Sequence, residues 1–120
     1  MSWIDSPQMH MLARYLDLSA MRQALITSNI ANVDTPGYRT KDIDFNGELV
    51  RAIENQSDST EPVVHEVQGL VARPDGNNVS IDRESMLLAE VQLQFSTAEQ
   101  VLKTQFKNLN LAINEGNSAI

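Results

Sequence analysis

The stretch "SNIANVDTPGYRTKDIDF", residues 28–45, decides how this chain is organised, because it ends one long helical pattern. Thr35-Pro36-Gly37-Tyr38 fits a type II turn, with Pro at the second position and Gly at the third. Asn29 and Asn32 precede it on the last helical turns, where their side chains can bond to nearby backbone groups. We therefore expect a helix end, a stiff turn and then an extended acidic segment.

Before this stretch, residues 6–33 carry the pattern of a long helix. Ser6 suits the N-cap and Pro7 suits the first helical position, where no amide donor is needed. No Gly or Pro occurs between Met9 and Val33, and the apolar residues form two adjoining stripes rather than one narrow face. Two interpretations stay open: a central helix buried in a bundle, or a helix that packs both within its chain and against other subunits.

A second helix is predicted over residues 82–116. Asp82 is the expected N-cap, Glu84 adds favourable negative charge to the first turn, and Gly116 is the expected stop. Lys103 and Lys107 lie late in this helix, on the favourable side of its dipole. Its apolar positions alternate steps of three and four over more than three heptads. For packing between the two helices we select Leu12, Leu16, Leu25, Ile26, Ile30, Leu88, Val91, Phe95, Ala98, Leu102 and Leu109.

The region between the helices is rich in turn formers and acids. Residues 34–62 read as a turn and an extended loop, with a short helical piece at 47–55. Residues 63–81 contain "PDGNN" between β-branched runs, which predicts a small hairpin pairing 70–72 with 79–81. The expected fold is therefore mainly α, a single domain over residues 1–120. Two long terminal helices pack as a coiled-coil-like pair, with an extended loop and a small β-hairpin in the middle.

Composition excludes several classes of protein. The 120 residues include 9 Lys+Arg and 16 Asp+Glu, a formal net charge of -7, which argues against binding nucleic acid or anionic lipid. No apolar run approaches the roughly 20 residues that span a bilayer, so we expect no membrane insertion. The N-terminus lacks the features of a Sec signal peptide. Cys is absent, which removes disulfides and thiolate metal sites.

No arrangement of residues points to catalysis. His10 and His65 are the only histidines and lack the spacing of a metal pair. The carboxylate pairs Asp42/Asp44 and Asp82/Glu84 are better explained by an acidic surface and helix capping than by general acid–base chemistry. No glycine-rich phosphate loop is present. We expect no enzymatic activity, no catalytic residue, no cofactor and no metal.

The opening stretch resembles a known family. "SNIANVDTPGYR" is similar to the N-terminal signature of the flagellar axial proteins, the bacterial rod, hook and hook-associated subunits. There, a long N-terminal helix ends in an Asn-Ile-Ala-Asn-x-x-Thr-Pro-Gly-Tyr string. The continuation "TKDIDF" looks like the proximal rod branch, and "DGNNVSIDRESMLLAEVQLQF" resembles the family's C-terminal segment. The likeness covers about residues 8–54 and 75–116.

This resemblance implies a structural subunit of the flagellar basal-body rod, exported by the flagellar type III secretion system and located in the periplasmic part of the basal body. Implied partners are other flagellar rod proteins, the hook-basal-body adaptor protein, the export gate and membrane-ring proteins, and further copies of the same chain. Such subunits assemble helically through their terminal helices and the loop after the first helix. A soluble coiled-coil adaptor or an export-chaperone-like binding module is the alternative.

The resemblance also marks candidate subunit contacts. Asn29 and Asn32 would fix the helix end, Pro36 and Gly37 would set the turn, and Tyr38 would anchor the loop in a neighbour's groove. The segment after the turn would lie along an adjacent subunit. The full set of implied contact residues is Asn29, Asn32, Asp34, Thr35, Pro36, Gly37, Tyr38, Asp42, Ile43, Asp44 and Phe45.

Overall fold

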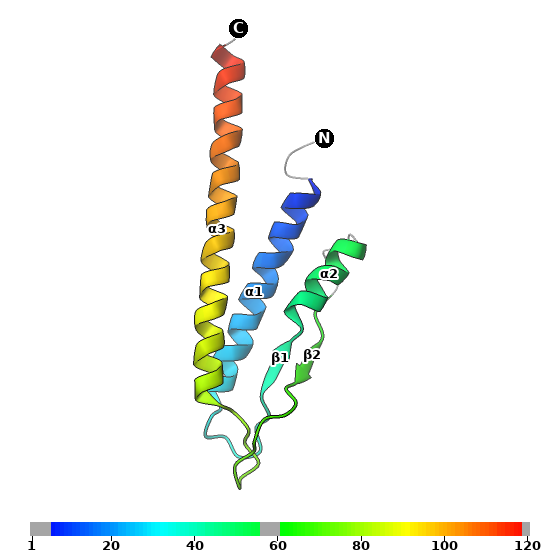
Figure 1. Ribbon diagram of the computed structural model, residues 1–120, viewed down its shortest axis with the longest axis vertical. Coiled ribbons are helices and arrows are strands. Elements are labelled where there is room, and N and C mark those ends of the chain that lie inside the picture. The colour runs from blue at the N-terminus through cyan, green and yellow to red at the C-terminus, as the bar shows by residue number, and fades with distance from the viewer. Residues whose placement is uncertain (1–5, 56–60, 119–120) are drawn as a thin grey trace.

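The computed structural model describes residues 6–55 and 61–118 and shows an elongated, mainly helical molecule. Its described elements follow the order α1 (Pro7–Ala31), β1 (Lys41–Ile43), α2 (Phe45–Asn55), β2 (Val64–Glu66) and α3 (Ile81–Ser118). The principal extents are 73 × 27 × 17 Å. Helix α1 lies between α3 on one side and β1 with α2 on the other (Figure 1). Two long terminal helices with a small antiparallel sheet between them confirm the predicted fold class.

Helix α1 begins where the sequence predicted and ends slightly earlier. The Ser6 Oγ accepts a hydrogen bond from the Met9 N–H at 3.1 Å, and Pro7 is the first helical residue. At the other end, the Asn32 N–H donates to the carbonyl of Ser28 at 3.1 Å. The predicted N-cap is therefore confirmed, and Val33 lies two residues beyond the last helical residue.

Both apolar stripes of α1 are covered by the chain itself. One stripe, centred on the fully buried Leu18, packs against Ile43 and Phe45. The other, centred on Ile26, packs against Leu87 and Val91 of α3. Within the described chain, α1 therefore has the packing of a bundle's central helix.

Helix α3 differs from its prediction at both ends. Its N-cap is Ser80 rather than Asp82, because the Ser80 Oγ accepts from the Arg83 N–H at 3.3 Å and its carbonyl accepts from the Glu84 N–H at 2.9 Å. The helix continues through Gly116 to Ser118. One Gly costs a helix only about 1 kcal/mol relative to Ala, and no Pro follows to force a stop. Lys103 and Lys107 consequently lie well before the last turn.

The small sheet forms between two strands whose pairing was not predicted from the sequence. Strand β1 pairs antiparallel with β2, with Asp42 opposite His65. The predicted partners, 70–72 and 79–81, are not strands, although "PDGNN" does form a tight turn in which the Gly76 N–H donates to the Arg73 carbonyl at 2.8 Å. The predicted pairing of 70–72 with 79–81 is wrong, because neither stretch is a strand and Ile81 already belongs to α3.

The predicted short helical piece is confirmed as α2 and starts earlier than expected. Asp44 caps it, since its Oδ1 accepts from the Gly47 N–H at 3.2 Å and its carbonyl accepts from the Glu48 N–H at 2.8 Å. The rest of the predicted 34–62 loop includes residues 56–60, which lie outside the described residues.

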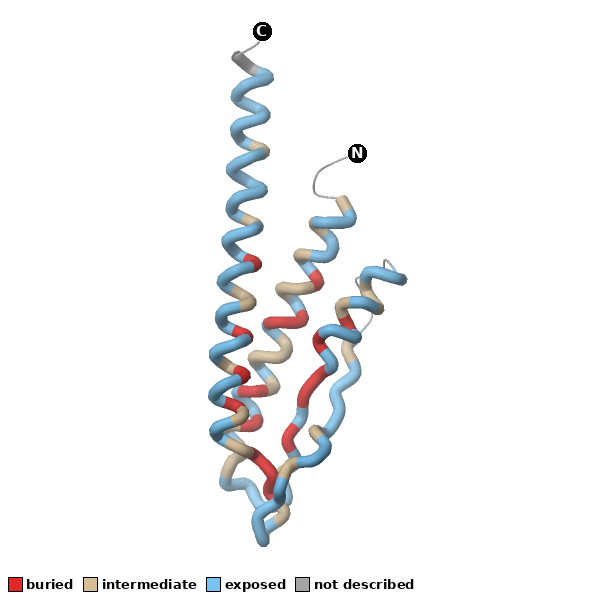
Figure 2. Tube along the Cα trace, viewed as in Figure 1, coloured by how far each residue is buried: buried red, intermediate tan, exposed pale blue. Residues whose placement is uncertain are grey.

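Exposure changes along α3. Its N-terminal part carries buried residues against α1, whereas the part that rises past the start of α1 is almost entirely exposed (Figure 2). Helix α3 has 38 residues and α1 has 25, a difference that corresponds to about 20 Å of helix. Across residues 6–55 and 61–118, no helix has the length and apolarity that a membrane span requires.

Candidate functional site

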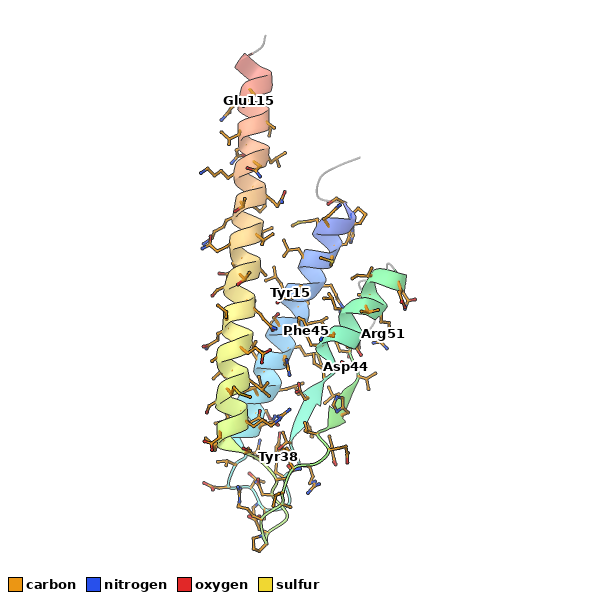
Figure 3. All side chains as sticks on the ribbon, in the orientation of Figure 1. Tyr15, Tyr38, Asp44, Phe45, Arg51 and Glu115 are labelled. Carbon is orange, nitrogen blue, oxygen red and sulfur yellow. The ribbon has the colours of Figure 1, made fainter. Side chains whose placement is uncertain are left out.

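Residues 28–45 meet residues 73–84 at one end of the molecule, where a network of polar side chains holds two turns and two helix ends together. We call this network the polar junction; its central side chains are Asn29, Thr40, Asp42, Asn77, Asn78 and Glu84, all of them buried. Tyr38 lies at its edge, close to the two turns (Figure 3).

The two turns of the polar junction are docked on each other. The Tyr38 N–H donates to the Thr35 carbonyl at 3.2 Å and Gly37 has a φ of 76°, which confirms the predicted type II turn. The Gly37 N–H donates in turn to the Asp75 carbonyl at 2.9 Å. A Cβ added to Gly76, whose φ is 88°, would lie 3.4 Å from the Gly37 Cα. Glycine at position 76 therefore permits both its own backbone conformation and the close approach.

Asn29 connects α1, β1 and α3 through one amide. Its Nδ2 donates to the Lys41 carbonyl at 2.8 Å and to the Glu84 Oε2 at 3.0 Å. Its Oδ1 accepts from the Tyr38 hydroxyl at 3.0 Å and from the Lys41 N–H at 3.1 Å. The amide thus uses all of its hydrogen-bonding capacity. It bonds to both the N–H and the carbonyl of Lys41, the two backbone groups that a neighbouring strand would otherwise pair with.

Two further asparagines complete the polar junction from the other side. The Asn77 Nδ2 donates to the carbonyls of Asn32 at 2.9 Å and Thr35 at 2.8 Å, which holds the end of α1 and the turn. The Asn78 Oδ1 accepts from the Thr40 N–H at 2.6 Å and from its hydroxyl at 2.8 Å. Sequence reasoning missed both roles, because "DGNN" indicated only a turn.

The buried charges of the polar junction are paired. Asp42 accepts from the Arg22 Nε at 3.1 Å and lies 3.3 Å from the Arg83 guanidinium. The Glu84 Oε1 accepts from Arg83 at 2.6 Å. Two carboxylates therefore face two guanidiniums, an arrangement that satisfies buried charges. Arg22 and Arg83 were not predicted, since sequence spacing does not show that they approach Asp42.

The predicted contact residues divide by burial. Exposed members are Asp34, Thr35, Pro36, Gly37 and Asp44; half-buried members are Asn32 and Tyr38; buried members are Asn29, Asp42, Ile43 and Phe45. Phe45 packs edge-on against Tyr15 with ring centroids 5.1 Å apart (Figure 3). The extended segment thus lies along the chain's own α1, and a contact of this segment with another subunit stays a prediction.

Of the residues selected for packing between the two helices, Ile26, Ile30, Leu88 and Val91 belong to the cluster between α1 and α3. Leu25 instead packs against the cluster of Leu18, Ile43 and Phe45. Ile26, Val91 and Ala98 are buried, and the remaining eight are half-buried. Leu87 also belongs to the cluster around Ile26 and was missed, because the heptad count favoured its neighbour Leu88.

Little in the described chain points to chemistry. Residues 6–55 and 61–118 contain no group of three or more His, Cys, Asp or Glu side chains that could hold a metal ion. His10 and His65 are both exposed and lie on different elements. Burial raises the pKa of the Tyr15 hydroxyl, and the nearby Glu90 carboxylate raises it further. The network around Asn29 joins α1, β1 and α3 of the chain.

Comparison with known proteins places this geometry in a family. A family model described as "Flagella basal body rod protein" matches residues 16–39, which contain Asn29 and the type II turn. The flagellar basal body rod protein FlgB of Borrelia hermsii is 34% identical over 122 residues, covering 83% of this chain and 90% of the relative. The chain belongs to the FlgB family. The Escherichia coli (strain K12) FlgB is 33% identical, covering 85% of this chain and 89% of the relative, and that of Cereibacter sphaeroides is 36% identical, covering 88% and 93%.

Membership of the FlgB family is consistent with the structural role of the polar junction, which holds two turns and two helix ends together. The family match covers most of α1 and the turn that follows it, so the segment matched by the model is the segment that builds one side of the polar junction. In this member of the FlgB family, the second side comes from residues 73–84.

Proposed function

We propose that this chain is a structural subunit of the proximal rod of the bacterial flagellar basal body, where it assembles helically through its terminal helices and the loop after α1. The observation that carries the proposal is the mismatch between the two helices. Helix α3 is about 20 Å longer than α1. The additional part of α3 carries exposed apolar side chains, including Leu111 at 51% and Ile113 at 53% exposure. A subunit that leaves such a helix in water is suited to burying it against neighbours.

The loop after α1 provides a second surface through which the subunit can contact its neighbours. Asp34, Thr35, Pro36 and Gly37 are exposed at the tip of the molecule, while the polar junction behind them fixes their backbone. A rigid exposed turn loses little conformational entropy when it docks. We assign this exposed tip to the contact with the next subunit, and a contact of Ile43 and Phe45 with another subunit stays a prediction.

Partners and location follow from the same proposal. The chain contacts other flagellar rod proteins, the hook-basal-body adaptor protein, the export gate and membrane-ring proteins, and copies of itself. It reaches the periplasmic part of the basal body through the flagellar type III export system. Contacts that do not close into a ring generate an open helical assembly.

One surface variant tests the proposal without disturbing the core. Ile113→Asp places a charge on an exposed position of α3, so the subunit should fold and be made normally. We expect loss of swimming and of rods in electron micrographs of basal bodies. Asn110→Asp is the matched control, with the same charge three residues away on a polar position, and should swim. Normal motility of Ile113→Asp would contradict the proposal; a tagged chain found only in soluble complexes would instead support the adaptor alternative.

A further inference from the structure

Helix α3 carries a second apolar stripe on the side facing away from α1. We call it the outer stripe; its members follow steps of seven, four, seven and seven residues and are Met86, Leu93, Thr97, Thr104 and Leu111. Such steps keep side chains on one face of a helix. Leu93 follows the fully buried Val91 by two residues, which is about 200° around the helix axis. The outer stripe therefore lies opposite the face that packs on α1.

The outer stripe is exposed along its whole length. Met86 is 65%, Leu93 is 69% and Leu111 is 51% exposed, and both threonines are exposed. The Thr97 hydroxyl donates to the Leu93 carbonyl and the Thr104 hydroxyl to the Gln100 carbonyl, each at 2.9 Å. Because these hydroxyls bond to their own helix, the threonines can present their methyl groups to a partner. The outer stripe thus extends over 26 residues as a surface with apolar character.

Opposite charges flank the two halves of this surface. Glu90 lies between Met86 and Leu93, and Lys107 lies between Thr104 and Leu111; both are exposed. Within residues 6–55 and 61–118, neither side chain forms an ion pair, and the Glu90 carboxylate lies near the Tyr15 hydroxyl of α1. The ion pairs of α3 join Arg83 to Asp42 and Glu84. A carboxylate therefore flanks the N-terminal half of the stripe and an ammonium group flanks the C-terminal half, and these two groups of neighbouring copies are complementary.

We propose that the outer stripe packs against the outer stripe of a second copy of this chain, with the two α3 helices parallel and shifted by 18 residues. Eighteen residues are five helical turns, about 27 Å, so the shift keeps both stripes facing each other. Leu93 of one copy then lies beside Leu111 of the other, Met86 beside Thr104, and Glu90 within reach of Lys107. The parallel direction rests on the proposed function, since the subunits of a polar rod point the same way.

With this shift, a contact between two copies covers only one half of each outer stripe. The N-terminal half of a stripe meets the C-terminal half of one neighbour, and its own C-terminal half is available to another. The contact is heterologous and does not close, so it extends along the helix direction. A shift of about 27 Å is close to half of the 57 Å that 38 helical residues span.

Engineered disulfides test the shift directly, because the natural chain contains no Cys. Leu93→Cys and Leu111→Cys in one chain should give a ladder of disulfide-linked multimers when isolated basal bodies are oxidised. Within a chain these positions lie about 27 Å apart on a straight helix, too far for an internal disulfide. Each single variant is a control and should give no ladder. Met86→Cys with Leu111→Cys should also give none, whereas an antiparallel pair would link these two positions.

The outcomes separate the two proposals. Links only between positions 86 and 111 would overturn the parallel shift. No links from either pair, in basal bodies that contain the chain, would overturn the outer stripe as a contact and leave the rod function standing. Absence of the wild-type chain from basal bodies would overturn both.

A charge exchange provides a measurement that does not need cysteines. Glu90→Lys alone and Lys107→Glu alone should reduce swimming, because each places like charges across the contact. The double variant should restore swimming, since it restores the opposite pair. If both single variants swim like the wild type, or if the double variant swims no better than either single one, the inference is wrong.

Discussion

Helices α1 and α3 both carry apolar side chains on more than one face but use them differently. Both stripes of α1 are covered, one by α3 and one by β1 and α2. Helix α3 buries Leu87, Val91 and Ala98 on one face and leaves Met86 and Leu93 in water. Within the described chain, α1 is therefore packed on two sides, whereas α3 is packed on one side and offers a long exposed surface on the other.

This difference separates stability from assembly. Side chains on α1 contribute to folding of the single subunit, because their removal leaves cavities or unpaired groups inside it. Outward side chains of α3 contribute little until another molecule covers them. Substitutions of the same kind on the two helices should therefore have different effects.

The largest contrast is expected between two leucines. Leu18→Ala should destabilise the subunit by about 2–5 kcal/mol, because Leu18 is fully buried and its removal leaves a cavity. Leu93→Ala should change the stability by no more than about 0.5 kcal/mol, since Leu93 is 69% exposed. Urea unfolding of the dilute chains measures both. Equal losses would show that the outer face of α3 is packed within the subunit.

The next contrast concerns asparagines. Asn29→Ala should cost about 1–3 kcal/mol, because it leaves Glu84 and the Lys41 backbone without their partner in a buried site. Asn110→Ala, on the exposed part of α3, should be close to neutral. Thermal unfolding followed by circular dichroism compares the two. An unchanged melting temperature for Asn29→Ala would mean that water replaces the amide at no cost.

A smaller and local effect is expected at the end of α3. Gly116→Ala should favour the helix there by about 1 kcal/mol, and an added Cβ would meet nothing within 4 Å. Because this end has no packing with α1, the gain should slow local amide exchange without raising the stability of the whole subunit. A rise in global stability would instead indicate that the end of α3 is coupled to the core.

The smallest effect is a pH dependence at α1. Burial raises the pKa of Tyr15 above its ordinary value of 10.0, and Glu90 adds to the rise. The folded state therefore keeps the proton to higher pH than the unfolded chain, so this contribution is present below about pH 10 and is lost as pH rises through the folded pKa. Tyr15→Phe should remove this part of the loss, which begins as the pH rises past the ordinary tyrosine pKa of 10.0. An identical pH dependence in both chains would contradict the shift.

Local patterns were sufficient to predict the helices and the type II turn. Ser6 followed by Pro7 marked the start of α1, and Pro36-Gly37 marked the turn, because each signal acts over a few residues. The partner of β1 was not predictable in this way. Strand β2 lies more than twenty residues further along the chain and carries only three residues, all exposed, so no local pattern marks it.

The polar junction shows the same limit. The importance of Asn29 was visible from its place in the opening stretch, but its actual partners were not. The amide contacts Glu84, 55 positions away, and no spacing rule connects the two. Asn77 and Asn78 look like turn formers in the sequence, and only their burial in the folded chain shows that they bind the other turn.

The docked turns also bring two distant points of the chain together. The Gly37 N–H donates to the Asp75 carbonyl, and the Thr40 N–H donates to the Asn78 side chain. The segment between α1 and α3 therefore begins and ends at the same place, and we call these four paired residues the neck. Strands β1 and β2 and helix α2 lie on the excursion from that neck. Lengthening the excursion away from its contacts with α1 should leave the crossing of α1 and α3 unchanged. Extra residues are therefore compatible with the same helical base in the excursion, and not at the neck itself.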